Sequence, residues 1–179
     1  KKVDEIDLIY INTNQKFAGQ IKDFVKNFKI NKKIKVVVEP VKKEEEKLGA
    51  IGAINYLIKK EKINDDLLII AGDNLFDFEC SDFAEFYREK KKSVVAFFDL
   101  KDKGKVRNRF GVGVLDKNQK ITSFEEKPSE PKSALAATAC YIFPREAATL
   151  FQTYLKKNNP DAPGFFIKWL CGRKGVYGF

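Results

Sequence analysis

The chain has 179 residues, of which 44% are hydrophobic and 33% charged, and its formal net charge is +9. This length predicts one domain that can bury its own core. No apolar stretch has the length of a membrane span or the pattern of a signal peptide. Lysines mostly stand beside glutamates, as in segments 42–47 and 88–92, and no basic stripe alternates with aromatic residues. The composition therefore disfavours nucleic-acid binding and is compatible with a positive pocket for a phosphorylated small molecule.

The sequence contains no histidine, which excludes imidazole acid–base chemistry and histidine metal sites. Its three cysteines, Cys80, Cys140 and Cys171, are too few and too scattered for a disulfide framework or a metal cluster. We expect reduced thiols in a cytoplasmic protein. Methionine is also absent, so we expect that residue 1 is not the translational start.

In the first half of the chain, apolar runs typical of buried strands alternate with segments of helical periodicity. The predicted order is strand 7–14, helix 17–28, strand 34–39, helix 49–60, strand 67–71, helix 81–91 with Ser81 as its N-cap, and strand 93–99. This alternation predicts a parallel sheet with crossover helices.

The second half of the chain is richer in strands. We predict strands 110–115, 121–126 and 134–143, with residues 116–120 as the turn of a hairpin, then helix 146–155, a loop at 160–164, helix 165–171 and strand 176–179. The predicted fold class is α/β, with a Rossmann-like, mostly parallel sheet and crossover helices, followed by a β-rich second half.

Two glycine-containing segments are candidate sites in the first half. Gly72-Asp73-Asn74 follows an all-apolar strand, at the edge where open α/β sheets bind ligands. Asp73 there is either a Mg²⁺ ligand or part of an ordinary turn. Gly49 and Gly52 stand at the start of a helix, where backbone N–H groups favour an anion, although simple loop entry and tight packing explain glycines equally well.

Three predicted strands of the second half carry further candidates. Glu125-Glu126-Lys127-Pro128 is either a charged strand edge or a site that binds hydroxyls through Glu126 and an anion through Lys127. On a regular strand Glu126 and Lys127 point to opposite faces, unless the backbone kinks. Gly111 and Gly113 in the preceding strand indicate a bulge or close ligand approach. Thr138 and Tyr141 either line a cavity or belong to the core.

The order of these motifs resembles the sugar-1-phosphate nucleotidyltransferases, and among them the glucose-1-phosphate thymidylyltransferases. The resemblance runs from about residue 6 to the end of the chain. The motifs that carry it are G-x-x-G-A-I (49–54), G-D-N (72–74), F-G-V (110–112), F-E-E-K-P (124–128), E-P-K-S (130–133) and A-x-T-x-x-Y (136–141).

The resemblance implies that a phosphate oxygen of a sugar 1-phosphate attacks the α-phosphorus of a nucleoside triphosphate, giving a nucleotide sugar and pyrophosphate. It implies catalytic roles for Lys127, which meets the sugar phosphate, and for Asp73, which binds Mg²⁺. The other positions that match the family's binding residues are Gly111, Glu126, Ala137, Thr138 and Tyr141 at the sugar site, and Gly49, Gly52 and Gly72 at the nucleotide site. The oligomeric state stays open, a homo-oligomer included.

The sequence also departs from the family pattern. The N-terminal glycine-rich loop that cradles the triphosphate and the W-x-D-x-G segment with a second metal-binding aspartate are not in these 179 residues. We therefore expect a single nucleotidyltransferase domain, residues 1–179, seen as an inactive fragment. Gly52 stands where thymidylyltransferases often carry a base-reading glutamine, which leaves the base open. A non-catalytic nucleotide-sugar-binding or regulatory relative is the main alternative, and a glycosyltransferase of related fold the weaker one.

Overall fold

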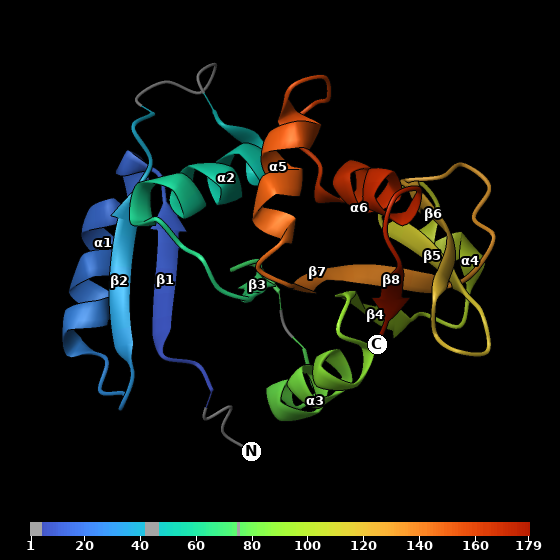
Figure 1. Cartoon of the computed structure of the whole chain (residues 1–179), viewed down its shortest axis with the longest axis horizontal. Coiled ribbons are helices and arrows are strands. Elements are labelled where there is room, and N and C mark those ends of the chain that lie inside the picture. The colour runs from blue at the N-terminus through green and yellow to red at the C-terminus, as the bar shows by residue number, and fades with distance from the viewer. Residues whose placement is uncertain (1–4, 42–46, 75) are drawn as a thin grey trace.

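The computed structural model of the chain describes residues 5–41, 47–74 and 76–179 (Figure 1). Helices and strands alternate along most of this length. In chain order they are β1 (Leu8–Thr13), α1 (Gln15–Asn27), β2 (Lys33–Val38), α2 (Gly49–Glu61), β3 (Leu67–Ile70), α3 (Cys80–Lys90), β4 (Ser93–Asp99), α4 (Lys103–Val106), β5 (Gly111–Leu115), β6 (Ile121–Glu126), β7 (Leu135–Phe143), α5 (Ala147–Leu155), α6 (Pro163–Cys171) and β8 (Val176–Gly178).

The first three elements form a βαβ unit. β1 and β2 pair in parallel, with Leu8 opposite Lys33 and Thr13 opposite Val38, and α1 contacts β2. The sequence predicts an apolar inner face on this helix. Three of its members, Phe17, Phe24 and Phe28, are instead 45%, 58% and 47% exposed, and Ala18 is the buried residue of α1. Helical periodicity located the helix but not the extent of its packing.

The larger sheet is organised around β7. Its strand order is β6-β5-β7-β4-β8, with β3 also paired to β7. Ile142 of β7 lies opposite Leu68 of β3 on one side and opposite Val94 of β4 on the other, and both pairings are antiparallel. β3 and β4 therefore run in the same direction, as their crossover through α3 predicts, but a strand from the second half of the chain lies between them. The pairing of β4 with β8 is parallel.

Alternate residues of β7 contribute to two hydrophobic cores, one on each face of the sheet. Tyr141 and Phe143 pack into the core formed with α2, α5 and α6, where Phe151 and Phe166 stack at 4.5 Å. Cys140 and Ile142 pack into the core formed with α3. Figure 1 shows α5 and α6 on one side of β7 and α3 on the other. Burial on both faces explains why this strand is apolar almost throughout.

Several local features differ from the sequence predictions. α3 begins at Cys80 with Glu79 as N-cap, so Ser81 is not the cap, and its hydroxyl lies 3.3 Å from Oδ1 of Asp82. The one-turn helix α4 was not predicted; Asp102 caps it by accepting a hydrogen bond from the Gly104 N–H at 2.7 Å.

The three cysteines are free thiols. Burial raises the pKa of each, for Cys171 to about 11, so the uncharged thiol is favoured at neutral pH. In the described ranges, no helix combines the length and apolar character needed to cross a membrane.

Candidate functional site

The β5–β6 hairpin carries the first group of candidate residues. Asp116 closes its turn by accepting hydrogen bonds from the Asn118 and Lys120 N–H groups, both at 2.9 Å. Gly111 lies directly opposite Glu126 in the antiparallel register. The predicted hairpin is confirmed, and it sets the first glycine of β5 beside the second carboxylate of β6.

The two glycines of β5 make room for aromatic rings. A Cβ atom on Gly111 would lie 2.6 Å from Cζ of Phe124, and one on Gly113 would lie 2.5 Å from Cζ of Phe97. The register shift between β5 and β6 falls later, between Val114 and Leu115. A bulge therefore does not explain these glycines, whereas close approach of neighbouring groups does.

The adjacent carboxylates Glu125 and Glu126 have opposite environments. Glu125 forms an ion pair with Lys132 at 2.9 Å, and this hydrogen-bonded ammonium lowers the pKa of Glu125. Glu126 is half-buried, and burial raises the pKa of Glu126, while the charge of Lys127 acts in the opposite direction. The two interpretations of the motif thus apply to different residues. Glu125 is a charged edge residue, and Glu126 faces the protein.

The backbone kinks immediately after Glu126. Lys127 has φ of 47°, in the left-handed region that residues with a Cβ rarely adopt. Its N–H still donates to the Phe110 carbonyl at 3.0 Å, so the kink begins where the β5–β6 ladder ends. The strict alternation of a strand therefore stops at Glu126, and Lys127 presents an exposed ammonium beside it.

The candidate residues of β7 lie in and beside the core. Tyr141 is 5% exposed, and burial raises its pKa, with the charge of Glu126 as the next contribution. Thr138 donates its hydroxyl to the Ala96 carbonyl at 3.0 Å, where β4 and β7 shift register. Ala137 pairs with Phe97. Tyr141 is thus electrostatically coupled to Glu126, while the hydroxyl proton of Thr138 is engaged by the backbone.

The residue before the Gly72-Asp73-Asn74 turn is hydrogen-bonded to the same strand, β7. The Ala71 N–H donates to the Ala139 carbonyl at 3.1 Å, and the Asn74 N–H closes the turn on the Ala71 carbonyl at 3.3 Å. Ala139 has φ of 54°, a second left-handed residue beside the candidate positions. Asp73 and Gly72 are exposed. The turn and the middle of β7 are therefore neighbours.

Asp73, the residue predicted to bind a metal ion, offers a single carboxylate. Across ranges 5–41, 47–74 and 76–179, no group of three or more Asp, Glu or Cys side chains gathers as a metal site. Mg²⁺ in phosphate-transferring enzymes often takes only one or two protein carboxylates and completes its shell with phosphate oxygens and water. An exposed carboxylate in a turn fits that mode of binding.

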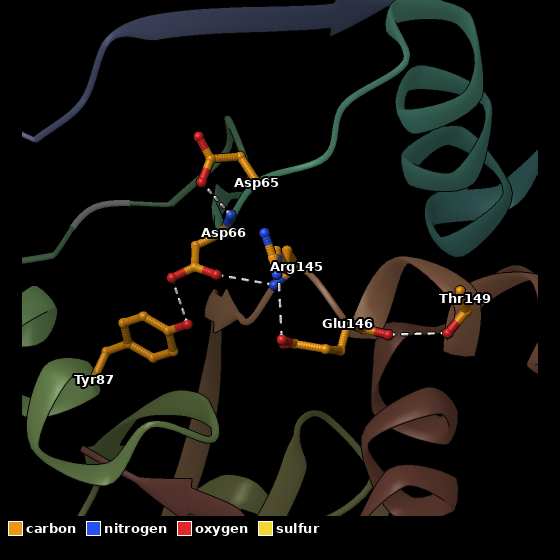
Figure 2. Close-up of polar contacts among 6 residues, drawn as sticks. All are labelled: Asp65, Asp66, Tyr87, Arg145, Glu146 and Thr149. Carbon is orange, nitrogen blue, oxygen red and sulfur yellow. Dashed lines mark hydrogen bonds and ion pairs between the residues drawn. The ribbon is translucent and has the colours of Figure 1, made fainter.

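The start of β3, which leads to this turn, is held by a polar network (Figure 2). Asp66 accepts a hydrogen bond from the Tyr87 hydroxyl of α3 at 2.6 Å and another from the Arg145 N–H, which follows β7, at 2.9 Å. Desolvation and the bond to Asp66 both raise the pKa of Tyr87. One carboxylate therefore connects three elements around β3.

The glycines of α2 lie at a different place, beside the loop before α6. Gly49 has φ of 68°, and a Cβ atom there would lie 2.7 Å from the backbone of Pro160, whose carbonyl accepts the Ile51 N–H at 2.9 Å. Gly49 borders a cavity of about 490 Å³, and Gly52 borders a separate hollow. Its lining includes Asn12, Lys16, Glu39, Gly49 and Ala53.

Two buried or half-buried polar groups characterise this cavity. Asn12 donates from Nδ2 to Oε1 of Glu39 at 3.0 Å, while its own Oδ1 is buried and has no hydrogen-bond partner among the described residues. Burial raises the pKa of Glu39, and the bond from Asn12 opposes that rise. Neither residue was predictable from the sequence, because each stands at a strand end without a distinctive motif.

The structure also adds Gly164, which the sequence analysis treated only as part of a loop. It lies in the first turn of α6, buried against Glu126. The signal that identified Gly49, a glycine at the start of a helix, applies to Gly164 equally well. The structure thus gathers Gly111, Glu126, Lys127 and Tyr141 into one group. Asp73 lies in the turn after the adjoining strand β3, and Gly49 and Gly52 form a second group beside Pro160, in the loop before α6.

Comparison with known proteins gives the family. The nucleotidyl transferase family model matches residues 2–166. A glucose-1-phosphate adenylyltransferase of Clostridioides difficile is 34% identical over 99 residues, which cover 53% of this chain and 24% of that protein. A candidate mannose-1-phosphate guanyltransferase of Sulfolobus acidocaldarius is 25% identical over 143 residues, covering 79% and 37%. The chain thus spans only a minor part of the length of these relatives.

A solved structure supports the fold. A candidate glucose-1-phosphate thymidylyltransferase of Bacillus anthracis, crystallised with sucrose, superposes with a TM-score of 0.74 at 24% identity, covering 96% of this chain and 66% of that one. The α/β class and the β-rich second half predicted from the sequence are confirmed by this match. The relatives are named as sugar-1-phosphate nucleotidyltransferases, and the chain belongs to the nucleotidyl transferase family.

Proposed function

We propose that the protein transfers a nucleotidyl group from a nucleoside triphosphate to a sugar 1-phosphate, with Glu126 and Lys127 at the sugar-phosphate end of the site. The observation that carries this proposal is the pair of neighbours at the end of β6: a half-buried carboxylate followed by a left-handed kink and an exposed ammonium. A carboxylate accepts hydrogen bonds from sugar hydroxyl groups, and an ammonium binds a phosphate as a compact point charge.

In the proposed reaction a phosphate oxygen of the sugar 1-phosphate attacks the α-phosphorus of the triphosphate. The new P–O bond forms as the bond to the β-phosphate oxygen breaks, and pyrophosphate leaves with that electron pair. Glu126 orients the sugar, and Lys127 holds the attacking phosphate, so the chain contributes positioning and charge stabilisation. A magnesium ion held by Asp73 would supply charge neutralisation for the phosphates.

We place the nucleoside at the cavity beside α2. Gly49 lines this cavity at the start of the helix, and the cavity volume of about 490 Å³ lies within the size range of small-molecule sites. Relatives carry adenylyl-, guanylyl- and thymidylyltransferase names. We therefore leave the base and the sugar open, with glucose 1-phosphate as the first sugar to test.

The test is pyrophosphate release by the full-length protein, with each common nucleoside triphosphate paired with glucose 1-phosphate and mannose 1-phosphate. Lys127→Ala should lower turnover by about 100-fold or more, because it removes the cation that faces the sugar phosphate. Lys132→Ala is the matched control, since it loses only the exposed ion pair with Glu125. Normal turnover in Lys127→Ala would refute the role of this lysine, and a wild type that binds nucleotide sugars without turnover would identify a binding protein.

A further inference from the structure

Gly164 lies where helix α6 meets strand β6, and its lack of a side chain is a requirement of that contact. A Cβ atom on Gly164 would overlap Oε2 of Glu126 and lie 2.7 Å from its Cδ and 3.2 Å from Cε1 of Phe124. The overlapping atoms form the end of the Glu126 side chain, so moving this carboxylate is the direct way to relieve the overlap. Any residue other than glycine must therefore displace the Glu126 carboxylate or lift the start of α6.

The same carboxylate oxygen also borders Gly111. A Cβ atom on Gly111 would lie 3.0 Å from Oε2. Oε2 thus occupies a slot between two glycines that come from β5 and α6, segments more than fifty residues apart. Oε2 therefore has backbone on two sides, which limits the orientations open to the carboxylate.

Positive charges around this slot oppose the rise that burial causes in the pKa of Glu126. The N-terminal turn of α6, a helix of nine residues, carries a partial positive charge. Lys127 adds a full positive charge beside Glu126, and the nearby titratable group on β7 is the neutral Tyr141 hydroxyl. A fixed, charged acceptor is what a hydroxyl-binding site needs.

We propose that Gly164 is a positioning residue that fixes the Glu126 carboxylate to accept a hydroxyl group of the sugar 1-phosphate. The inference rests on the proposed function and deepens it, because it makes the start of α6 a wall of the sugar site. Gly164→Ala should move the carboxylate and weaken binding of the sugar phosphate. Binding of the nucleoside triphosphate should not change.

The experiment is a double-mutant cycle in the full-length protein with Gly164→Ala, Glu126→Ala and both together. Gly164→Ala should raise KM for the sugar 1-phosphate by about tenfold or more, the cost of losing a hydrogen bond to a charged group. KM for the triphosphate should stay the same. In the Glu126→Ala background the second substitution should have no further effect, because shortening residue 126 empties the space that the new methyl group needs.

Gly172→Ala is the control at the other end of the same helix. Gly172 has φ of −73°, and a Cβ atom there would have its nearest neighbour at 3.7 Å, so alanine should be tolerated. The inference is overturned if Gly164→Ala behaves like Gly172→Ala, if it raises both KM values alike, or if its effect persists in full without Glu126. Absence of turnover in the wild type with every substrate pair overturns the proposed function itself.

Discussion

The left-handed backbone at Lys127 leads to a prediction that does not depend on activity. An L-residue with φ near 47° is about 1–2 kcal/mol less favourable than in the right-handed region, and Pro128 restricts the preceding residue further. Glycine avoids this strain but loses about 0.5–1 kcal/mol through its freedom in the unfolded chain. Lys127→Gly should therefore be more stable than Lys127→Ala by about 0.5–1 kcal/mol. For a domain of this size, each kcal/mol shifts Tm by roughly 2–4 °C.

The assay is urea or thermal unfolding of the 179-residue chain carrying each substitution. Lys22→Gly and Lys22→Ala are the matched controls, because Lys22 is exposed within α1 and glycine in a helix interior is about 1 kcal/mol less stable than alanine. The order of the two variants should invert between these positions. If Lys127→Ala is as stable as Lys127→Gly or more so, the kink that places Lys127 beside Glu126 does not exist.

Two further predictions concern the surroundings of the site. Asp66→Ala removes the acceptor of both the Tyr87 hydroxyl and the Arg145 N–H, and should lower the free energy of unfolding by about 1–3 kcal/mol in urea titrations. The control is Asp65→Ala, which loses a hydrogen bond to the neighbouring Asp66 N–H and should lower the free energy of unfolding by less. An equal loss in the two variants would contradict the role of the network. Burial raises the pKa of Glu126, so the folded state holds this proton more tightly than the unfolded state. Stability from this group is complete below the ordinary carboxyl pKa and is lost as pH rises through the raised pKa. Tm measured from acid to neutral pH should show that loss in the wild type and not in Glu126→Gln. If the dependence of Tm on pH is the same in both proteins, the burial of this carboxylate is refuted.

Local sequence signals predicted most of the elements. The strands 93–99 and 121–126 have the bounds expected from their apolar patterns, and the Asp116 turn forms the predicted hairpin. Long-range pairing was not predictable in this way. The insertion of β7 between β3 and β4 depends on pairs of residues that are 36 to 76 positions apart, on which local periodicity carries no information.

The candidate site was predictable by residue type but not by geometry. The Glu125-Glu126-Lys127 motif stood out because of its composition, yet only the structure shows that one carboxylate is paired outward and the other buried. Lysine gives no sign of a left-handed φ, since glycine or asparagine is the usual residue there. Gly164 was missed because its role depends on a carboxylate thirty-eight residues earlier in the chain.

The central claim is that this protein joins a sugar 1-phosphate to the nucleotidyl group of a triphosphate. The most direct measurement is mass spectrometry of the products formed by the full-length protein from a nucleoside triphosphate and a sugar 1-phosphate that carries ¹⁸O in its phosphate. We predict a nucleotide sugar that retains the label, with one unlabelled pyrophosphate released for each molecule formed. Absence of a nucleotide sugar, or label in the pyrophosphate, would contradict the claim.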